Sequence, residues 1–437
     1  MRNEPEPAVA LPGSTPRGYG GAAVYQVSAN ARATVHSLER DYRLRQVSAW
    51  PIESLQVHCI VVRLPDVTAP SDLIARLAHD SRVESVQPLN QFTTESESNE
   101  DASADSPPPG GRPYLPLEAN LRELGVLQAH SLSEGAAVRV AIIDTGVDYR
   151  HPDLRGRIIA RSDFVAASGD FTHDRHGTQV AGVIAATAVD GLGVLGVAPK
   201  SRLIALKACW ALRQDAAEAT CNSFTLAQAL QAAISARADI VNLSLAGPPD
   251  PLLTRLIRYG MQHGIIYVGA VPPAGNRSSD TFPIGIPGVL GVQSAEDAAG
   301  SSRHLLAPGR GILTLVPGGH YDFASGSSLA TAEVTGVVAL LLADGRRLSG
   351  PRVEQILVRT SRQLATPTGV LTLVNACAAI ADALARANCQ GSDEAIRRQH
   401  DERPSTRSEE SVQLKKEQRR TLGRDVSGTI VVAHAGS

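Results

Sequence analysis

The sequence is poor in several residue types, and each shortage narrows the class of protein. Of the 42 basic residues only four are lysine, which together with the many alanines indicates a G+C-rich bacterial genome and not a function. No uncharged apolar run reaches the roughly 18 residues of a membrane-spanning helix, so no membrane span is predicted. The formal net charge of −2 gives no reason to expect nucleic acid or an anionic membrane as a partner.

The N-terminus lacks the pattern of a secretory signal. Residues 1–21 contain arginine, acidic residues and prolines, but no apolar run of about 7–15 residues. We therefore expect either that the protein stays inside the cell or that translation starts further upstream.

Cysteine is scarce, and five cysteines are too few for a disulfide scaffold. Cys209 and Cys221 flank a polar, alanine-rich loop and are candidates for one bridge, which would contribute about 3 kcal/mol or less through chain entropy. Cys377 and Cys389 lie at the two ends of a predicted helix over 376–388, which places them about 18 Å apart. A disulfide needs Cα atoms within about 7 Å, so we expect free thiols at this second pair.

The overall composition is that of a globular protein, 43% hydrophobic and 20% charged, with room for two or three domains. Shifts in composition divide the chain into five parts. These are a disordered N-terminus (1–21), a compact α+β unit (22–93), a flexible acidic linker rich in serine and proline (94–113), an α/β domain (114–389) and a charged, disordered tail (390–437). Within the tail, residues 428–433 suit one short strand.

The compact unit is predicted to follow the order βαββαβ of a small ferredoxin-like module. Its expected strands are 23–28, 44–50, 57–64 and 83–86, and its expected helices are 31–41 and 70–79, the second capped by Ser71. Because flexible, exposed linkers are where proteases cut, we expect any processing to occur in the linker that follows.

From residue 114 onward, apolar strands alternate with helices. The expected strands include 138–144, 203–208 and 265–271, and the expected helices include 117–132, 225–236 and 252–263. This alternation predicts an α/β fold, a doubly wound, mostly parallel sheet with helices on both faces.

Three motifs of the α/β domain contain residues of catalytic type. Asp144 follows a buried strand in an Asp-Thr-Gly motif, at the sheet edge where open α/β folds place their sites. His176 opens a helix of small and apolar residues. Ser328 begins another such helix, in the segment GSSLATAEVTG, where unpaired N–H groups favour an anion. Each residue alone is more often a cap or a packed polar group, but the order acid, base, nucleophile makes coincidence a poor explanation.

This order resembles that of the subtilisin-like serine proteases, the subtilase family. The resemblance implies that Ser328 is the nucleophile and that His176 removes its proton. It also implies that Asp144 orients the histidine and stabilises its positive charge. Ala332 and Glu333 stand where the family has proline and histidine, and we expect both replacements to be tolerated.

The resemblance also assigns a substrate edge and a prodomain. Ser244, Leu245, Ala246 and Gly247 match the backbone edge along which subtilases bind substrate. An extended peptide would add to this edge as a strand, with main-chain hydrogen bonds giving affinity. The compact unit at 22–93 is similar to the prodomain of subtilases and is therefore expected to act as an intramolecular inhibitor.

The oxyanion hole is where the sequence departs from the family. Subtilases place an asparagine just after a strand, in an Ala-Gly-Asn context. Without a gap Pro273 occupies this position, and proline has no N–H to donate, whereas three extra residues bring Asn276 there. The local motif favours Asn276 and the spacing to Phe282 favours Pro273, so Asn276 is the oxyanion candidate and the alternative stays open.

The sequence thus predicts a serine endopeptidase that hydrolyses peptide or protein substrates through an acyl-enzyme and is made as an inhibited precursor. Two alternatives remain, a catalytically degraded fold that only binds peptides and an acyl transferase that uses an amine in place of water. No cofactor is expected and no metal ligand is assigned, although many subtilases bind calcium. The prodomain and the candidate disulfide favour a secreted or periplasmic protein, whereas the missing signal argues against export.

Overall fold

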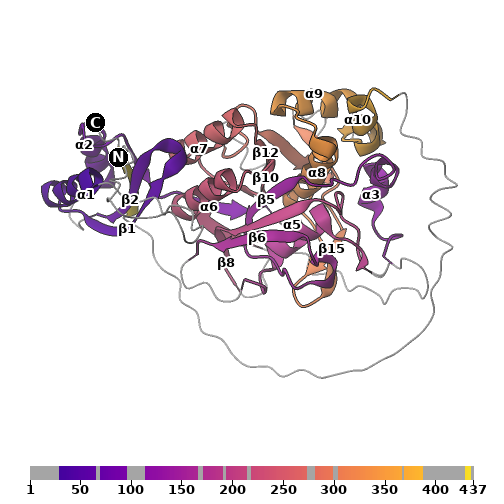
Figure 1. The fold of residues 1–437 in the computed structure, drawn as a ribbon, viewed down its shortest axis with the longest axis horizontal. Helices are drawn as coiled ribbons and strands as arrows, with labels where there is room; N and C mark the ends of the chain where they lie inside the picture. The colour runs from indigo at the N-terminus through magenta and orange to yellow at the C-terminus, as the bar shows by residue number, and fades with distance from the viewer. Residues whose placement is uncertain are drawn as a thin grey trace, which may run out of the picture.

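The computed structural model describes residues 29–64, 69–95, 114–165, 171–189, 193–213, 218–272, 281–298, 304–366, 369–386 and 429–434. They form an N-terminal unit, whose residues run from 29 to 95, and a larger α/β domain, whose residues run from 114 to 386. The N-terminal unit lies at one end of the α/β domain (Figure 1). The strand predicted at 23–28 lies outside the described residues.

The α/β domain is built on one large sheet. Its nine described strands follow the order β17-β18-β14-β13-β12-β10-β5-β7-β6, and all neighbours are parallel except β17 and β18. The strands are β5 (Arg139–Asp144), β6 (Ile158–Asp163), β7 (Arg202–Lys207), β10 (Ile240–Leu243), β12 (Ile266–Ala270), β13 (Leu290–Ser294), β14 (Leu305–Ala307), β17 (Arg362–Thr366) and β18 (Gly369–Leu373).

Helices cover both faces of this sheet, because successive residues of each strand point to opposite sides. In β5, Val140 and Ile142 belong to a core that includes α5 and α8, whereas Ala141 and Ile143 belong to a second core with α6 and α7. The helices are α5 (Arg175–Ala185), α6 (Ser223–Ser235), α7 (Pro251–Gln262), α8 (Ser327–Leu342), α9 (Gly350–Thr360) and α10 (Ala376–Ala383). The predicted doubly wound fold is confirmed.

Every residue of α8 is buried, which explains its sequence. A helix surrounded by protein has no solvent face, so it needs no polar stripe and can be small and apolar all round. The helix expected at 117–132 is wrong in extent: it is divided into α3 (Ala119–Glu123) and α4 (Val126–Ala129). Gly125 separates them with a φ of 68°, a conformation that glycine adopts readily and that ends a helix.

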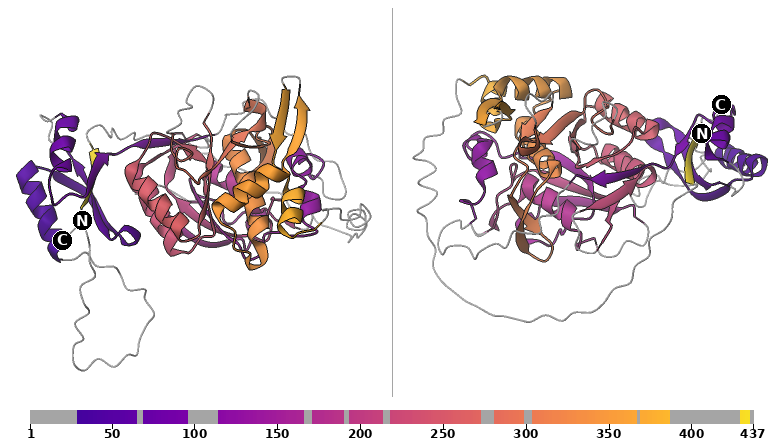
Figure 2. Two further views of the ribbon diagram at one scale, coloured as in Figure 1. Left: turned by 90° about the horizontal axis from the view of Figure 1, so that it is seen from above. Right: turned by 180° about the vertical axis from the view of Figure 1, so that it is seen from behind.

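The N-terminal unit contains α1 (Ala29–Tyr42), β1 (Arg45–Ile52), β2 (Val57–Arg63), α2 (Pro70–Ala78) and β3 (Ser85–Pro88). Ser71 does not cap α2, because the helix starts one residue earlier with Pro70 in its first position. The tail predicted to be disordered over 390–437 contributes β19 (Thr429–His434) to the sheet of this unit, whose order is β1-β2-β19-β3. Figure 2 shows this yellow strand among the indigo strands of the N-terminal unit.

The cysteines differ in part from expectation. Cys209 and Cys221 form the predicted disulfide, with Cα atoms 4.2 Å apart. Cys377 is also disulfide-bonded, so the free thiol expected there is wrong. The distance argument failed because α10 ends at Ala383 and does not continue to residue 388. Cys389 lies outside the described residues.

Candidate active site

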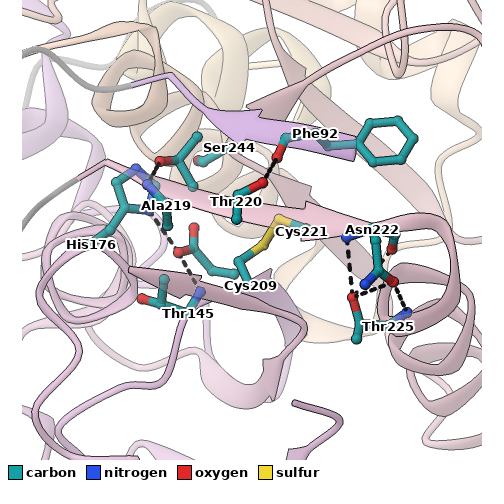
Figure 3. The surroundings of a disulfide bond; sticks show 12 residues. Phe92, Thr145, His176, Cys209, Ala219, Thr220, Cys221, Asn222, Thr225 and Ser244 are labelled. Carbon is teal, nitrogen blue, oxygen red and sulfur yellow. Dashed lines mark hydrogen bonds and ion pairs between the residues drawn. A yellow bond between two sulfur atoms is a disulfide. The ribbon is translucent and has the colours of Figure 1, made fainter. Parts of the chain in front are cut away.

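Asp144 and His176 meet at the carboxyl end of the central strand β5. Both side chains are buried, and His176 Nδ1 lies 2.6 Å from Asp144 Oδ1. The same carboxylate oxygen accepts a hydrogen bond of 2.6 Å from the backbone N–H of Thr145. Two donors therefore hold the carboxylate in place, and the carboxylate fixes the orientation of the imidazole ring (Figure 3).

The glycines of the two motifs allow this close approach. A Cβ atom at Gly177 would lie 2.5 Å from the carbonyl oxygen of Gly146, and one at Gly146 would lie 2.3 Å from the carbonyl oxygen of Phe171. In addition, the N–H of Gly177 donates to Thr145 Oγ1 over 2.9 Å. Any side chain at either glycine would push the start of α5, and with it His176, away from the end of β5.

A buried ion pair that the sequence analysis missed supports this corner. Lys207, the last residue of β7, forms an ion pair with Asp174, which also accepts a hydrogen bond of 3.0 Å from the Gly146 N–H. Burial raises the pKa of Asp174, and the contact with Lys207 opposes that rise. The available signal was Lys207 itself, a charge that follows the apolar residues 203–206 of a strand that finishes at the same sheet edge as β5.

Ser328 is the second residue of α8 and is fully buried. Its Oγ donates to the carbonyl oxygen of Ser244 over 3.0 Å, and Ser244 Oγ donates back to the Ser328 carbonyl over 3.1 Å. Among the described residues, His176 Nε2 is buried without a hydrogen-bond partner. The hydroxyl is therefore hydrogen-bonded to Ser244 and not to the histidine, and this bond must break before His176 can accept its proton.

A strand of the chain itself occupies the predicted substrate edge. β4 (Gln91–Thr94) continues from the N-terminal unit and lies between β11 (Leu245–Ala246) and β9 (Ala219–Asn222). It pairs antiparallel with both neighbours, so that its backbone is held on two sides. The linker expected to begin at Thr94 is therefore wrong at its start, because this residue ends a paired strand.

The second edge, β9, was not predicted. It forms a hairpin with β8 (Cys209–Ala211), and the Cys209–Cys221 disulfide ties the two strands together. Thr220 Oγ1 donates to the carbonyl oxygen of Phe92 over 3.1 Å, an interaction that Figure 3 shows beside the disulfide. The cysteine pair was a signal for a fixed hairpin, but not for the position of this hairpin beside β4.

Two side chains of the docked segment are enclosed by the α/β domain. The Phe92 ring is buried, with its centroid 5.1 Å from that of Phe282. A Cβ atom at Gly247 would lie 2.3 Å from Phe92, so this glycine leaves room for the ring. Gly247 also exchanges two backbone hydrogen bonds, of 3.1 and 2.9 Å, with Phe282. The predicted segment 244–247 therefore contacts the docked chain through backbone hydrogen bonds and through the close packing of Gly247 against the Phe92 ring.

Glu95 ends the docked segment beside Ser328. Its carbonyl oxygen accepts a hydrogen bond of 3.0 Å from the backbone N–H of Ser328, and its own N–H donates to the Ser244 carbonyl over 3.3 Å. Its side chain contributes to the lining of a cavity of about 280 Å³, together with Thr93, Ala246, Gly247, Pro248, Pro249, Pro272 and Thr281. Burial raises the pKa of the Glu95 carboxyl to about 7, and the nearby His176 opposes this rise.

Comparison with known proteins identifies this arrangement. The sequence model of the subtilase family matches residues 135–377 of this chain. The chain belongs to the subtilase family.

Similar proteins support the same assignment. The chain is 35% identical over 227 residues to an intracellular serine protease of Paenibacillus polymyxa, covering 48% of this chain and 68% of the relative. It is 33% identical over 244 residues to a subtilisin of Bacillus pumilus, covering 53% of this chain and 86% of that protein. Fervidolysin from Fervidobacterium pennivorans, a keratinolytic enzyme related to subtilisin, has a similar fold, with a TM-score of 0.61 at 23% identity over 80% of this chain and 59% of fervidolysin. The predicted family, fold and serine endopeptidase activity are confirmed.

The oxyanion hole of this subtilase is described only in part. Asn276 and Pro273 both lie in residues 273–280, outside the described part of the chain, so the choice between them stays a prediction. The backbone N–H of Ser328 is one donor in the correct place, because it already binds the carbonyl oxygen of Glu95.

The described residues assign neither a metal site nor a membrane span. Within them, no three His, Cys, Asp or Glu side chains are grouped so that they could hold a metal ion, and no residue is assigned to the calcium of other subtilases. Of the helices in this part of the chain, none combines the length and the apolar character that crossing a membrane requires.

Proposed function

We propose that this subtilase cleaves peptide bonds with Asp144, His176 and Ser328 as its catalytic triad, and that it is made as an inhibited precursor. The observation that carries the proposal is the docked segment, in which the Glu95 carbonyl oxygen accepts a hydrogen bond from the N–H of Ser328. A peptide in this position presents to Ser328 the carbonyl group that the hydroxyl would attack.

The reaction begins when Ser328 Oγ leaves the Ser244 carbonyl and transfers its proton to His176 Nε2. The oxygen then attacks the carbonyl carbon, and the resulting oxyanion is stabilised by the Ser328 N–H. Asp144 stabilises the imidazolium, which returns the proton to the leaving amine so that the C–N bond breaks and an acyl-enzyme remains. Water, deprotonated by the same histidine, hydrolyses the acyl-enzyme and regenerates the serine.

The first bond cut is that between Glu95 and Ser96. Glu95 provides the carbonyl at the serine, and Phe92, three residues before it, fills the pocket beside Phe282. We therefore place the end of the prodomain at Glu95 and not at residue 93. The cut leaves the same strand in the groove as a product, which blocks the entry of other peptides.

Contacts outside the groove support inhibition by the N-terminal unit. The Trp50 ring packs edge-on against Phe224, with centroids 4.6 Å apart. Gln87 Nε2 donates to Asp250 Oδ2 over 2.7 Å, and Gln87 Oε1 accepts from the Leu252 N–H over 3.0 Å. These contacts fix β3 against the start of α7, and β3 leads directly into the docked strand.

A fluorophosphonate probe tests for the activated nucleophile. Once the N-terminal unit has been cut off and removed from the groove, we expect the protein to be labelled at Ser328 and the Ser328→Ala variant to remain unlabelled. Ser327→Ala is the matched control, since it removes the neighbouring hydroxyl and should keep labelling. Absence of labelling in wild type from which the N-terminal unit has been removed would favour a fold that only binds peptides. The product mass from a model peptide in the presence of an amine distinguishes hydrolysis from acyl transfer.

A further inference from the structure

One of the two inner strands in the described sheet of the N-terminal unit comes from the opposite end of the chain. β19 pairs antiparallel with β2, from Thr429 opposite Arg63 to His434 opposite His58. On its other side it pairs antiparallel with β3, from Ile430 opposite Pro88 to Ala433 opposite Ser85. In the described sheet, β3 is joined to β2 only through this strand.

The geometry of a sheet makes β19 a structural requirement for this arrangement. Neighbouring strands lie about 4.8 Å apart, so β2 and β3, with one strand between them, are roughly 10 Å apart and cannot pair directly. Removal of β19 would leave the edges of both strands without main-chain partners. Residues 57–62 of β2 are all buried, as is typical of a strand in the middle of a sheet.

The strand next to β19 leads into the active site. β3 ends at Pro88, and the chain then enters β4 and reaches Glu95 at Ser328. Gln87 pairs through its backbone with Val431, while its side chain bonds to the start of α7. β19 therefore supports the segment that blocks the groove. Because β19 follows the α/β domain in the sequence, it stays covalently connected to that domain.

We propose that β19 holds the N-terminal unit on the enzyme after the cut behind Glu95, so that the cleaved protein stays latent until the tail is removed or displaced. The inference rests on the proposed function, which supplies the cut. After the cut, the N-terminal fragment is bound at two linked places, the groove with α7 and the strand β19. Two linked sites raise the apparent affinity by about 10²–10⁴-fold over one site, because the second contact forms within the complex.

The other candidate for the position between β2 and β3 is the strand predicted at 23–28. Hydrogen exchange of the uncut, full-length Ser328→Ala protein distinguishes the two segments. We expect protected amides over 429–434, and a loss of that protection in Val431→Pro, because proline removes a ladder donor and clashes with the neighbouring strand. Val431→Thr, which keeps the N–H, is the matched control and should remain protected. Protection over 23–28 with none over 429–434 would overturn the proposal.

Retention of the N-terminal unit tests the functional part. Two different protease recognition sites are placed in the Ser328→Ala chain, one within residues 100–106 and one within residues 405–411. Cutting the first alone should leave the N-terminal fragment bound on dilution and gel filtration. Cutting both, after folding, should raise its dissociation constant by about 10²-fold or more, because β19 is then no longer tethered to the α/β domain.

Equal retention after one cut and after both cuts would contradict the tether. The same holds if Val431→Pro and Val431→Thr retain the fragment equally after the first cut alone. Because added proteases make both cuts, the outcome does not depend on self-cleavage. If wild type fails to cut itself while the tether behaves as expected, the proposed function is wrong and the role of β19 stands.

Discussion

Exchange of Glu95 for glutamine should remove the pH dependence with which the docked segment binds in the groove. In the docked segment, burial raises the pKa of the Glu95 carboxyl from 4.5 to about 7. A group whose pKa is raised on binding binds best in its protonated form. Docking is therefore strongest below pH 4.5, weakens as the pH rises towards 7, and changes little above that pH. Glutamine is neutral throughout and has nearly the same shape.

The size of the effect follows from this shift. A difference of about 2.5 pKa units at 1.36 kcal/mol each amounts to roughly 3 kcal/mol, or about 300-fold. Because the carboxyl keeps partial contact with solvent, which screens the effect, we expect about 10–100-fold at pH 8 and little difference near pH 4.5.

The assay is a competition between two peptides with the sequence of residues 89–99, one with glutamate and one with glutamine at position 95. Mass spectrometry of the mixture gives the ratio of the two kcat/KM values, which does not depend on how much of the enzyme is active. The ratio should favour the glutamine peptide increasingly from pH 5 to pH 8. A control pair with glutamine or glutamate at position 91, where the side chain is exposed, should show a flat ratio.

A ratio that stays flat for position 95 as well would refute the reasoning. It would mean that the carboxyl remains solvated or finds a positive partner when the peptide is bound, and that the cavity beside Glu95 does not select a neutral side chain.

Three further changes test separate parts of the account. Asn276→Ala should lower kcat by about 10²–10³ with little change in KM if Asn276 donates to the oxyanion, and steady-state kinetics of a cleaved peptide measures this. Burial raises the pKa of Glu333 well above its usual range, with Asn120 offsetting this in part, so Glu333 stabilises the fold at low pH and loses that contribution as the pH rises. Thermal unfolding of Glu333→Gln should therefore show a gain in Tm over wild type that grows from pH 5 to pH 9. Replacing Cys209 and Cys221 by serine should lower the free energy of unfolding by about 3 kcal/mol or less, measured in urea, and should raise KM more than it lowers kcat, because their hairpin forms one edge of the substrate groove.

The local motifs led to the three residues proposed as catalytic because each has a local physical reason. Asp144 follows an apolar strand, His176 and Ser328 begin buried helices, and the glycines beside them permit contacts that no other residue would allow. A sequence read segment by segment contains all of these features.

The missed features depend on pairing between distant segments. β19 pairs with strands more than 300 residues earlier in the chain, and β4 enters a groove built by residues 219–222 and 245–246. Short polar or mixed strands fit many partners, and their partner is set by the assembled surface and not by their own pattern. For the same reason the linker was predicted to start at Thr94, although that residue ends a docked strand.

The most direct test of the central claim is the intact mass of the purified full-length protein after incubation. If Ser328 cuts the bond behind Glu95, wild type should yield one fragment that ends at Glu95 and one that begins at Ser96, while Ser328→Ala should stay intact under the same conditions. If wild type remains whole, or if Ser328→Ala is cut at the same bond to the same extent, Ser328 is not the nucleophile that processes this chain.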